Sequence, residues 1–157
     1  MKAAKVGGVS AAVLLVAGGL IAQWEGKRYE AYPDPATGGA PYTVCYGHTG
    51  ADVVRGKRYT LEECNALLDA DMRVANAAVR RCIPVPMLVQ IEAALTSAAF
   101  NIGPSVVCGS TLQRKALAND WPGACAALDS WKYAGGRVMR GLVLRRADER
   151  RVCEGSR

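Results

Sequence analysis

Three residues near the start of the chain could together carry out acid–base chemistry. Glu25 follows Trp24 at the end of an apolar stretch, and desolvation there favours the protonated form of a carboxyl group. Asp34 lies among prolines and glycines, where a solvated carboxyl group is expected to be ionised. Thr43 could hold a water molecule between the two acids through its hydroxyl. One proton donor and one ionised carboxylate are the pair that hydrolysis of a glycosidic bond requires.

A β-hairpin is expected to position these residues. Residues 27–32 are short and rich enough in tyrosine for a strand, and residues 42–46 (YTVCY) are rich in β-formers. Residues 33–41 between them carry three prolines and two glycines and predict a turn. Residues 47–58 are expected to form a loop.

The remainder of the sequence predicts helices. Thr60 and Glu63 form a capping box that opens a helix running to about Arg80. Further helices are expected at 86–100, at 111–118 after Ser110, at 121–131 after Asp120, and at 137–153 beyond the break at Gly135-Gly136. These elements predict an α+β fold, with a small hairpin lobe beside a larger helical lobe and a cleft between them.

The N-terminal segment predicts export. Lys2 and Lys5 precede an uncharged stretch, residues 6–23, of which residues 6–22 are apolar or small, near the lower length limit for a membrane-spanning helix. Its glycines and alanines make it weakly hydrophobic. We therefore expect residues 1–23 to act as an uncleaved signal-anchor before a domain at 24–157; a cleaved signal peptide is the second interpretation and a buried helix the third.

The six cysteines agree with export. They are even in number, spread over the chain and form no CxxC pair, and the sequence has only one histidine. Disulfides are therefore favoured over a zinc site, and no metal or cofactor is expected. The formal net charge of +6 suits an anionic partner but by itself selects none.

Taken together, these residues resemble the phage lysozymes of glycoside hydrolase family 24. Trp24-Glu25-Gly26, Asp34 nine residues after Glu25, and Thr43-(x3)-Gly47-His48 match the family's active-site region. Later segments also match, namely Phe100-Asn101-Ile102-Gly103, Gly109-Ser110-Thr111-Leu112, residues 131–136 and Arg145-Arg146. The resemblance covers about residues 24–153.

The resemblance implies a lysozyme-like fold and a function in host cell lysis. The reaction would be hydrolysis of the β-1,4 bond between N-acetylmuramic acid and N-acetylglucosamine in peptidoglycan. Glu25 would be the general acid, with Asp34 and Thr43 positioning water in an inverting displacement. The N-terminus resembles signal-arrest-release endolysins, which implies tethering to the inner membrane through residues 6–22 and later release into the periplasm. Glycan strands are the expected partner, nucleic acid is not, and a monomer is expected.

Other residues receive more modest roles. His48 and Asn101 are candidate substrate-binding residues, although a structural role, hydrogen-bonded beside the hairpin, is favoured for His48, and Asn101 could instead cap the helix before it. Trp121 and Trp131 are expected to pack helices, and the arginines of the last helix to form mostly a solvated face. The favoured disulfides are Cys45–Cys64, Cys82–Cys108 and Cys125–Cys153, the first of which would pin the hairpin to the first long helix.

Two alternatives stay open from the sequence. A lytic transglycosylase needs the glutamate but no water-positioning aspartate, and the turn between Asp34 and Thr43 is longer than is usual in the family. A non-catalytic wall-binding or membrane-perturbing protein would need only the apolar segment and the basic charge.

Overall fold

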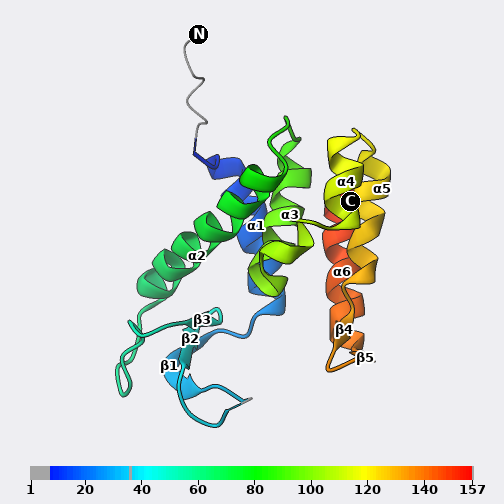
Figure 1. Ribbon diagram of the computed structural model, residues 1–157. Helices are drawn as coiled ribbons and strands as arrows, with labels where there is room; N and C mark the ends of the chain where they lie inside the picture. The colour runs from blue at the N-terminus through cyan, green and yellow to red at the C-terminus, as the bar shows by residue number, and fades with distance from the viewer. Residues whose placement is uncertain (1–7, 36, 157) are drawn as a thin grey trace.

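The computed structural model describes residues 8–35 and 37–156 and has the predicted α+β architecture. Figure 1 shows a small sheet lobe at one end of α2, helices α4 to α6 on the opposite side, and α3 between them. The sheet lobe contains β1 (Arg28–Pro33), β2 (Tyr42–Cys45) and β3 (His48–Thr49) in the order β1-β2-β3. The hairpin is therefore confirmed, and a short third strand, β3, lies within the segment expected to be a loop.

The apolar N-terminal segment forms a packed helix, α1 (Ala11–Trp24), which crosses the expected domain boundary at residue 23. Ser10 caps its start by accepting a hydrogen bond from the Val13 amide. Val13, Ala17 and Ile21 are buried against α2 and α3. No helix among the described residues is long and apolar enough to cross a membrane. Residues 1–7 lie outside the described residues, and with them the first part of the expected span.

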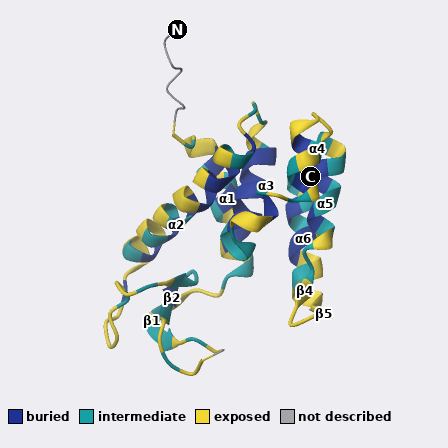
Figure 2. Cartoon of the chain, viewed as in Figure 1, coloured by how far each residue is buried: buried dark blue, intermediate teal, exposed yellow. Residues whose placement is uncertain are grey.

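The long helices α2 (Leu61–Cys82) and α3 (Val89–Ile102) form the centre of the molecule. The predicted capping box is present, because Thr60 accepts from the Glu63 amide and the Glu63 carboxylate accepts from the Thr60 amide. Helix α3 begins three residues later than predicted from Pro86, and its residues 91–99 are all buried (Figure 2). Since these residues are apolar or small at nearly every position, α3 can pack against α1, α2 and α6 at once.

The C-terminal part completes the core around α3. It contains η1 (Pro104–Val106), α4 (Thr111–Leu117), α5 (Trp121–Ala127), η2 (Leu128–Ser130) and α6 (Arg140–Cys153). Ser110 and Asp120 cap α4 and α5 as predicted. The last helix starts at Arg140 and not at 137, because the glycine pair Gly135-Gly136 closes a small hairpin between β4 (Tyr133–Ala134) and β5 (Arg137–Val138).

Three disulfides staple these elements, and they join the same pairs that the sequence favoured. Cys45–Cys64 ties β2 to the first turn of α2, Cys82–Cys108 ties the end of α2 to the segment after η1, and Cys125–Cys153 ties α5 to the end of α6. The first of them attaches the sheet lobe to the helical lobe.

Candidate active site

Glu25 stands at the end of α1, at the point where the chain turns into the sheet lobe. Its backbone N–H donates to the Ile21 carbonyl at 2.8 Å, so it closes the last turn of the helix. Its side chain is 24% exposed, which leaves the carboxyl group partly open to solvent. The buried face of α1 therefore fixes the backbone that carries Glu25.

The carboxyl group of Glu25 is held by an arginine of α6. Arg145 Nη1 donates to Glu25 Oε1 at 2.7 Å, and the Arg145 side chain is only 5% exposed. A charge-assisted hydrogen bond from a guanidinium disfavours a proton on the oxygen that accepts it. A proton on Glu25 would therefore sit on Oε2.

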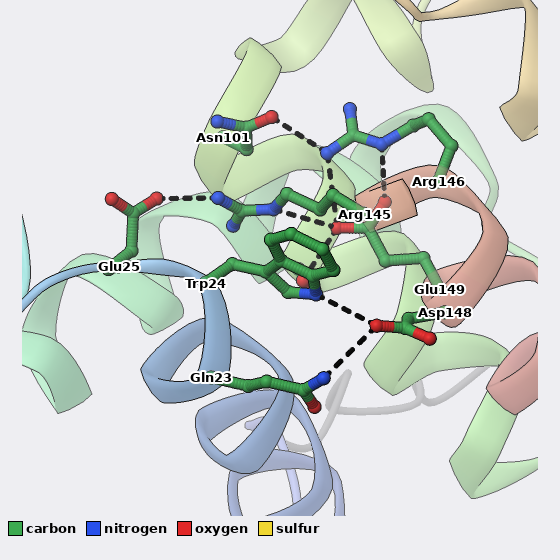
Figure 3. Close-up of polar contacts among 9 residues, drawn as sticks. Gln23, Trp24, Glu25, Asn101, Arg145, Arg146, Asp148 and Glu149 are labelled. Atoms are coloured by element: carbon green, nitrogen blue, oxygen red, sulfur yellow. Dashed lines mark hydrogen bonds and ion pairs between the residues drawn. The ribbon is translucent and has the colours of Figure 1, made fainter. Parts of the chain in front are cut away.

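Arg145 belongs to a buried polar cluster on α6, which Figure 3 shows beside Glu25. Glu149 is fully buried between Arg145 and Arg146, and Arg146 is itself fully buried. The expectation that the arginines of this helix form a solvated face is therefore wrong for Arg145 and Arg146. Charged side chains three and four residues apart share one helix face, so the Arg-Arg-(x2)-Glu spacing was a signal in the sequence that could have revealed the cluster.

The cluster is densely connected. Arg146 Nε lies 2.8 Å from Glu149 Oε2, and Arg145 Nε lies 3.3 Å from Glu149 Oε1. Ser97 of α3 donates to Glu149 Oε1 at 2.8 Å. Arg146 Nη2 donates to Asn101 Oδ1 at 2.7 Å, so Asn101 orients a buried arginine through its carbonyl oxygen.

A second set of contacts attaches the end of α1 to α6. The indole N–H of Trp24 and the amide of Gln23 both donate to one carboxylate oxygen of Asp148, each at 3.1 Å (Figure 3). Asp148 is also paired with Arg151. Glu25 thus follows directly after two residues that are hydrogen-bonded to the same helix that supplies Arg145.

Gly47 brings the sheet lobe against Glu25. It has φ +79°, a left-handed conformation that favours glycine, and a Cβ built there would lie 3.3 Å from Glu25 Oε2. A larger residue would therefore crowd the oxygen on which the proton is expected. Gly47 also lines a groove of about 460 Å³ between α2 and α3, together with Thr49, Asp71, Val74 and Phe100 among others.

Thr43 lies at the centre of the small sheet. It pairs with Tyr32 of β1 on one side and with Thr49 of β3 on the other. The Thr43 and Thr49 hydroxyls are 2.9 Å apart, and Thr49 Oγ1 also donates to the Gly47 carbonyl at 3.3 Å. The Thr43 hydroxyl is therefore linked, through one other side chain, to the backbone that faces Glu25.

Asp34 lies directly after β1, and its backbone organises the turn. Its amide donates to the Gly39 carbonyl at 3.0 Å, and its carbonyl accepts from Thr37 at 3.2 Å and from Gly38 at 2.7 Å. These bonds absorb the extra length of the turn, so that Pro33 still pairs with Tyr42 in the hairpin. Asp34 lies two residues after Tyr32, which pairs with Thr43 across the hairpin.

His48 links the sheet lobe to α2. Its Nδ1 lies 2.8 Å from Asp71 Oδ2 and its Nε2 lies 3.0 Å from Asp52 Oδ2. Burial lowers the pKa of His48, but the hydrogen bonds to Asp71 and Asp52 outweigh burial, and the net pKa is raised. With a carboxylate at each ring nitrogen, His48 has a structural role in this conformation.

Asn101 lies at a second hollow of about 440 Å³, which it lines with Ile102, Trp131, Tyr133 and Leu142. Trp131 also packs against the main core, as predicted for a helix-packing residue. An amide beside two aromatic rings is a lining suited to a sugar ring. Among the described residues, no group of three or more histidine, cysteine or acidic side chains could hold a metal ion.

Comparison with known families and proteins identifies what this arrangement is similar to. The family model for phage lysozyme matches residues 22–149. A SAR-endolysin of Bacteriophage PS119 is 43% identical over 129 residues, covering 82% of this chain and 75% of the relative.

Solved structures share the fold. The active form of the P1 phage endolysin Lyz superimposes with a TM-score of 0.81 at 24% identity, covering 95% of this chain and 96% of the other. The muramidase domain of SpmX from Asticaccaulis excentricus gives a TM-score of 0.78 at 30% identity, covering 92% and 96%.

Proposed function

The chain belongs to the phage lysozyme family, and from this premise we propose that Glu25 is its general acid, with Asp34 and Thr43 positioning the attacking water. Members of this family are lysozymes, so the chain is a peptidoglycan-degrading enzyme of the endolysin type. The bond cleaved is the β-1,4 linkage between N-acetylmuramic acid and N-acetylglucosamine. Neither the transglycosylase nor the non-catalytic binding protein is favoured by the relatives.

The observation that carries the proposal is the environment of the two Glu25 oxygens. Oε1 accepts from Arg145, which fixes the carboxyl group in one orientation. Oε2 faces Gly47, a residue that lines the groove of about 460 Å³. A proton on Oε2 would thus lie beside a residue that lines the groove, and we expect the oxygen of the leaving sugar to lie there.

The hairpin register supports the roles of Asp34 and Thr43. Side chains alternate along a strand, so residues two positions apart lie on the same face. Tyr32 pairs with Thr43, and Asp34 lies two residues after Tyr32. This register favours placement of the Asp34 carboxylate and the Thr43 hydroxyl on one face of the hairpin. A water held between them could attack the sugar on the side opposite to Glu25, which gives inversion at the anomeric carbon.

Substitution of Glu25 tests the acid. Glu25→Gln keeps the shape of the side chain and the contact with Arg145 but has no proton of suitable acidity. We expect it to lower the rate at which purified peptidoglycan is cleared by about 1,000-fold or more, which leaves the residual rate that substrate binding alone supports. Glu30→Gln in β1 is the matched control, because Glu30 is exposed and paired with Arg58 at the surface. A folded Glu25→Gln enzyme with wild-type activity would contradict the assignment.

The products separate hydrolysis from the alternative chemistry. Mass spectrometry of the released fragments should show reducing muramic acid ends, since water is the nucleophile. Anhydro ends would instead mean that the sugar's own hydroxyl attacks and that Asp34 positions no water. Asp34→Asn and Thr43→Ala should each lower the rate without changing the product ends.

We also propose that residues 6–22 first hold the enzyme in the inner membrane, uncleaved, and that residues 11–22 later form most of α1 in the released periplasmic enzyme. The names of the SAR-endolysin relatives and the weak hydrophobicity of the segment support this. The docked helix explains why the segment would be retained, because Val13, Ala17 and Ile21 fill the core beneath Glu25. Removal of residues 1–23 would take these side chains away.

Fractionation tests this second proposal. Full-length protein is expected in both membrane and soluble periplasmic fractions, with the same intact mass in each. Depolarising the membrane should move protein to the soluble fraction. Recovery of a shortened chain alone would show that the segment is an ordinary signal peptide.

A further inference from the structure

The contact between Glu25 and Arg145 raises a problem for a general acid, because a guanidinium favours the ionised form of a neighbouring carboxyl group. A donor that loses its proton too readily is inactive at neutral pH. The cluster behind Arg145 contains a group that opposes this effect.

We propose that Glu149 is a positioning residue that limits the positive charge beside Glu25 by pairing with both Arg145 and Arg146. This inference rests on the proposed role of Glu25. Arg145 bridges the two carboxyl groups, with Nη1 at 2.7 Å from Glu25 and Nε at 3.3 Å from Glu149. Arg146 Nε lies 2.8 Å from the other oxygen of Glu149.

The charge count shows why Glu149 matters. Two arginines and Glu149 leave one net positive charge beside Glu25, whereas without Glu149 there would be two. Arg145, Arg146 and Glu149 are all nearly or fully excluded from water, so solvent screens this charge weakly. An uncompensated second charge would therefore strongly favour ionised Glu25.

Several buried polar atoms of the cluster, among them Arg146 Nε and Glu149 Oε2, make no hydrogen bond with the described residues. Arg145 Nη2 and Arg146 Nη1 are buried and have no hydrogen-bond acceptor among the residues that the structure describes. Burial raises the pKa of the Glu149 carboxyl, against the opposing attraction of Arg146 and the hydrogen bond from Ser97. The net pKa of Glu149 is raised, because the two arginines and the hydrogen bond from Ser97 offset its burial only in part. Its contacts with Arg146 at 2.8 Å and Arg145 at 3.3 Å are nevertheless those of a carboxylate paired with guanidinium groups.

Several other charged groups on the elements around the cluster have partners of their own. In α3 the one charged side chain, Glu92, is bound to Arg80 and Asn76 of α2. Other pairs are Asp148 with Arg151 in α6, Asp129 of η2 with Arg150, His48 with Asp71 and Asp52, and Lys27 over the rings of Tyr29 and Tyr46. Arg140, at the start of α6, is exposed to solvent. Glu149 is therefore the carboxylate best placed to balance Arg145.

Charge-changing variants test the proposal in both directions. Glu149→Gln should move the titration of the Glu25 carboxyl, followed by carbon-13 NMR, and the alkaline limb of the activity profile to lower pH by about one unit. Arg146→Gln should move both to higher pH. The double variant restores the net charge and should return both close to wild type.

Glu92→Gln is the matched control, because it removes a buried, arginine-paired carboxylate from α3 without changing the charge beside Glu25. We expect it to lower stability and to leave the titration of Glu25 in place. If Glu149→Gln does not fold, the comparison of Arg146→Gln with the double variant measures the same charge. Identical Glu25 titrations in wild type, Arg146→Gln and the variants lacking Glu149 would overturn the proposal.

The two readouts keep this inference separate from the proposed function. A spectrum of Glu25→Gln assigns the Glu25 resonance without any use of activity. If the titration moves and the activity profile does not, Glu149 acts as proposed but Glu25 is not the acid. If activity requires Glu25 but its titration does not respond, Glu25 is the acid and the role of Glu149 is wrong.

Discussion

Arg145 in α6 and Glu25 at the end of α1 are 120 positions apart in the sequence and are joined at 2.7 Å. The contact is well shielded, because Arg145 is 5% and Glu25 is 24% exposed. Ion pairs of this kind fix geometry more reliably than exposed pairs, which solvent and salt weaken. The position of α6 therefore decides where the carboxyl group of Glu25 lies.

Replacing Arg145 should affect both stability and catalysis. Arg145→Gln leaves Glu149 with one arginine and Glu25 with none, and we expect a loss of about 3–5 kcal/mol in the free energy of unfolding. The alkaline limb of the activity profile should move to higher pH, because loss of the positive charge favours protonated Glu25. Denaturant titration and rates between pH 5 and about 9 measure the two effects.

Arg150→Gln controls for the loss of an arginine from the same helix. Arg150 is 38% exposed and pairs with Asp129 and Glu154 near the surface. Its replacement should have little effect on the free energy of unfolding and should leave the pH profile unchanged. Equal effects of the two variants would mean that the contact with Glu25 has no special importance.

A methyl group at position 47 should disturb Glu25 directly. In Gly47→Ala the new Cβ would lie 3.3 Å from Glu25 Oε2, at a φ of +79°. We expect an activity loss of up to about 100-fold, because a small displacement of the acid misaligns proton transfer. Gly56→Ala has nearly the same strain at φ +78° but meets no atom within 4 Å, so it should cost similar stability, about 1–2 kcal/mol, and keep its activity.

The His48–Asp71 pair predicts a pH-dependent stability. The hydrogen bonds to Asp71 and Asp52 outweigh burial and raise the pKa of folded His48 above 6.5. The contribution of protonated His48 to the free energy of unfolding is therefore fully present below pH 6.5. It is lost as the pH rises through the pKa of His48 in the folded state. Asp71→Asn should cost about 1.5–3 kcal/mol in mildly acidic solution and clearly less in alkaline solution.

Asp69→Asn gives the comparison for that measurement. Asp69 lies on the same helix and pairs with Arg73 at an exposed site. Its loss should cost no more than about 0.5 kcal/mol, with no change between the two pH values. A pH-independent cost for Asp71→Asn would show that His48 is not protonated in the fold.

Much of the fold could be predicted because its signals are local. The capping box at Thr60, the Ser110 and Asp120 caps and the turn after Pro33 each depend on residues within a few positions. The start of α3 was placed three residues too early, because Pro86 suits a first helical turn but the chain around it stays extended up to Leu88. The β4–β5 hairpin was missed, since each strand has only two residues.

The site was harder to predict because its partners come from distant elements. Glu25, Asp34 and Thr43 could be selected by their spacing, whereas nothing local indicates that Arg145 would meet Glu25. The surroundings of His48 depend on Asp71, which α2 brings into reach from another lobe. The buried arginines of α6 looked like a solvated face, because two of their partners, Glu25 and Asn101, come from the end of α1 and from α3.

The packing of α1 allows the membrane and the folded states to be perturbed separately. Gly19 is exposed on α1 and an added Cβ meets nothing within 4 Å, whereas at Gly18 a Cβ would lie 3.5 Å from Met72. Gly19→Leu should keep or raise the stability of the soluble enzyme, because leucine is the better helix former. Gly18→Leu should lower it by about 1–3 kcal/mol through overpacking.

Both substitutions add the same apolar side chain to the membrane segment. Both should therefore increase the membrane-bound fraction several-fold, which corresponds to about 1 kcal/mol in the free energy of partitioning. Leu15→Gln should do the opposite at little cost to the fold, since Leu15 is 78% exposed on the docked helix. Fractionation measures the partition, and thermal unfolding of the soluble enzyme measures stability. If the membrane fraction follows the stability of the soluble form instead of the apolarity of residues 6–22, this segment does not act as a reversible anchor.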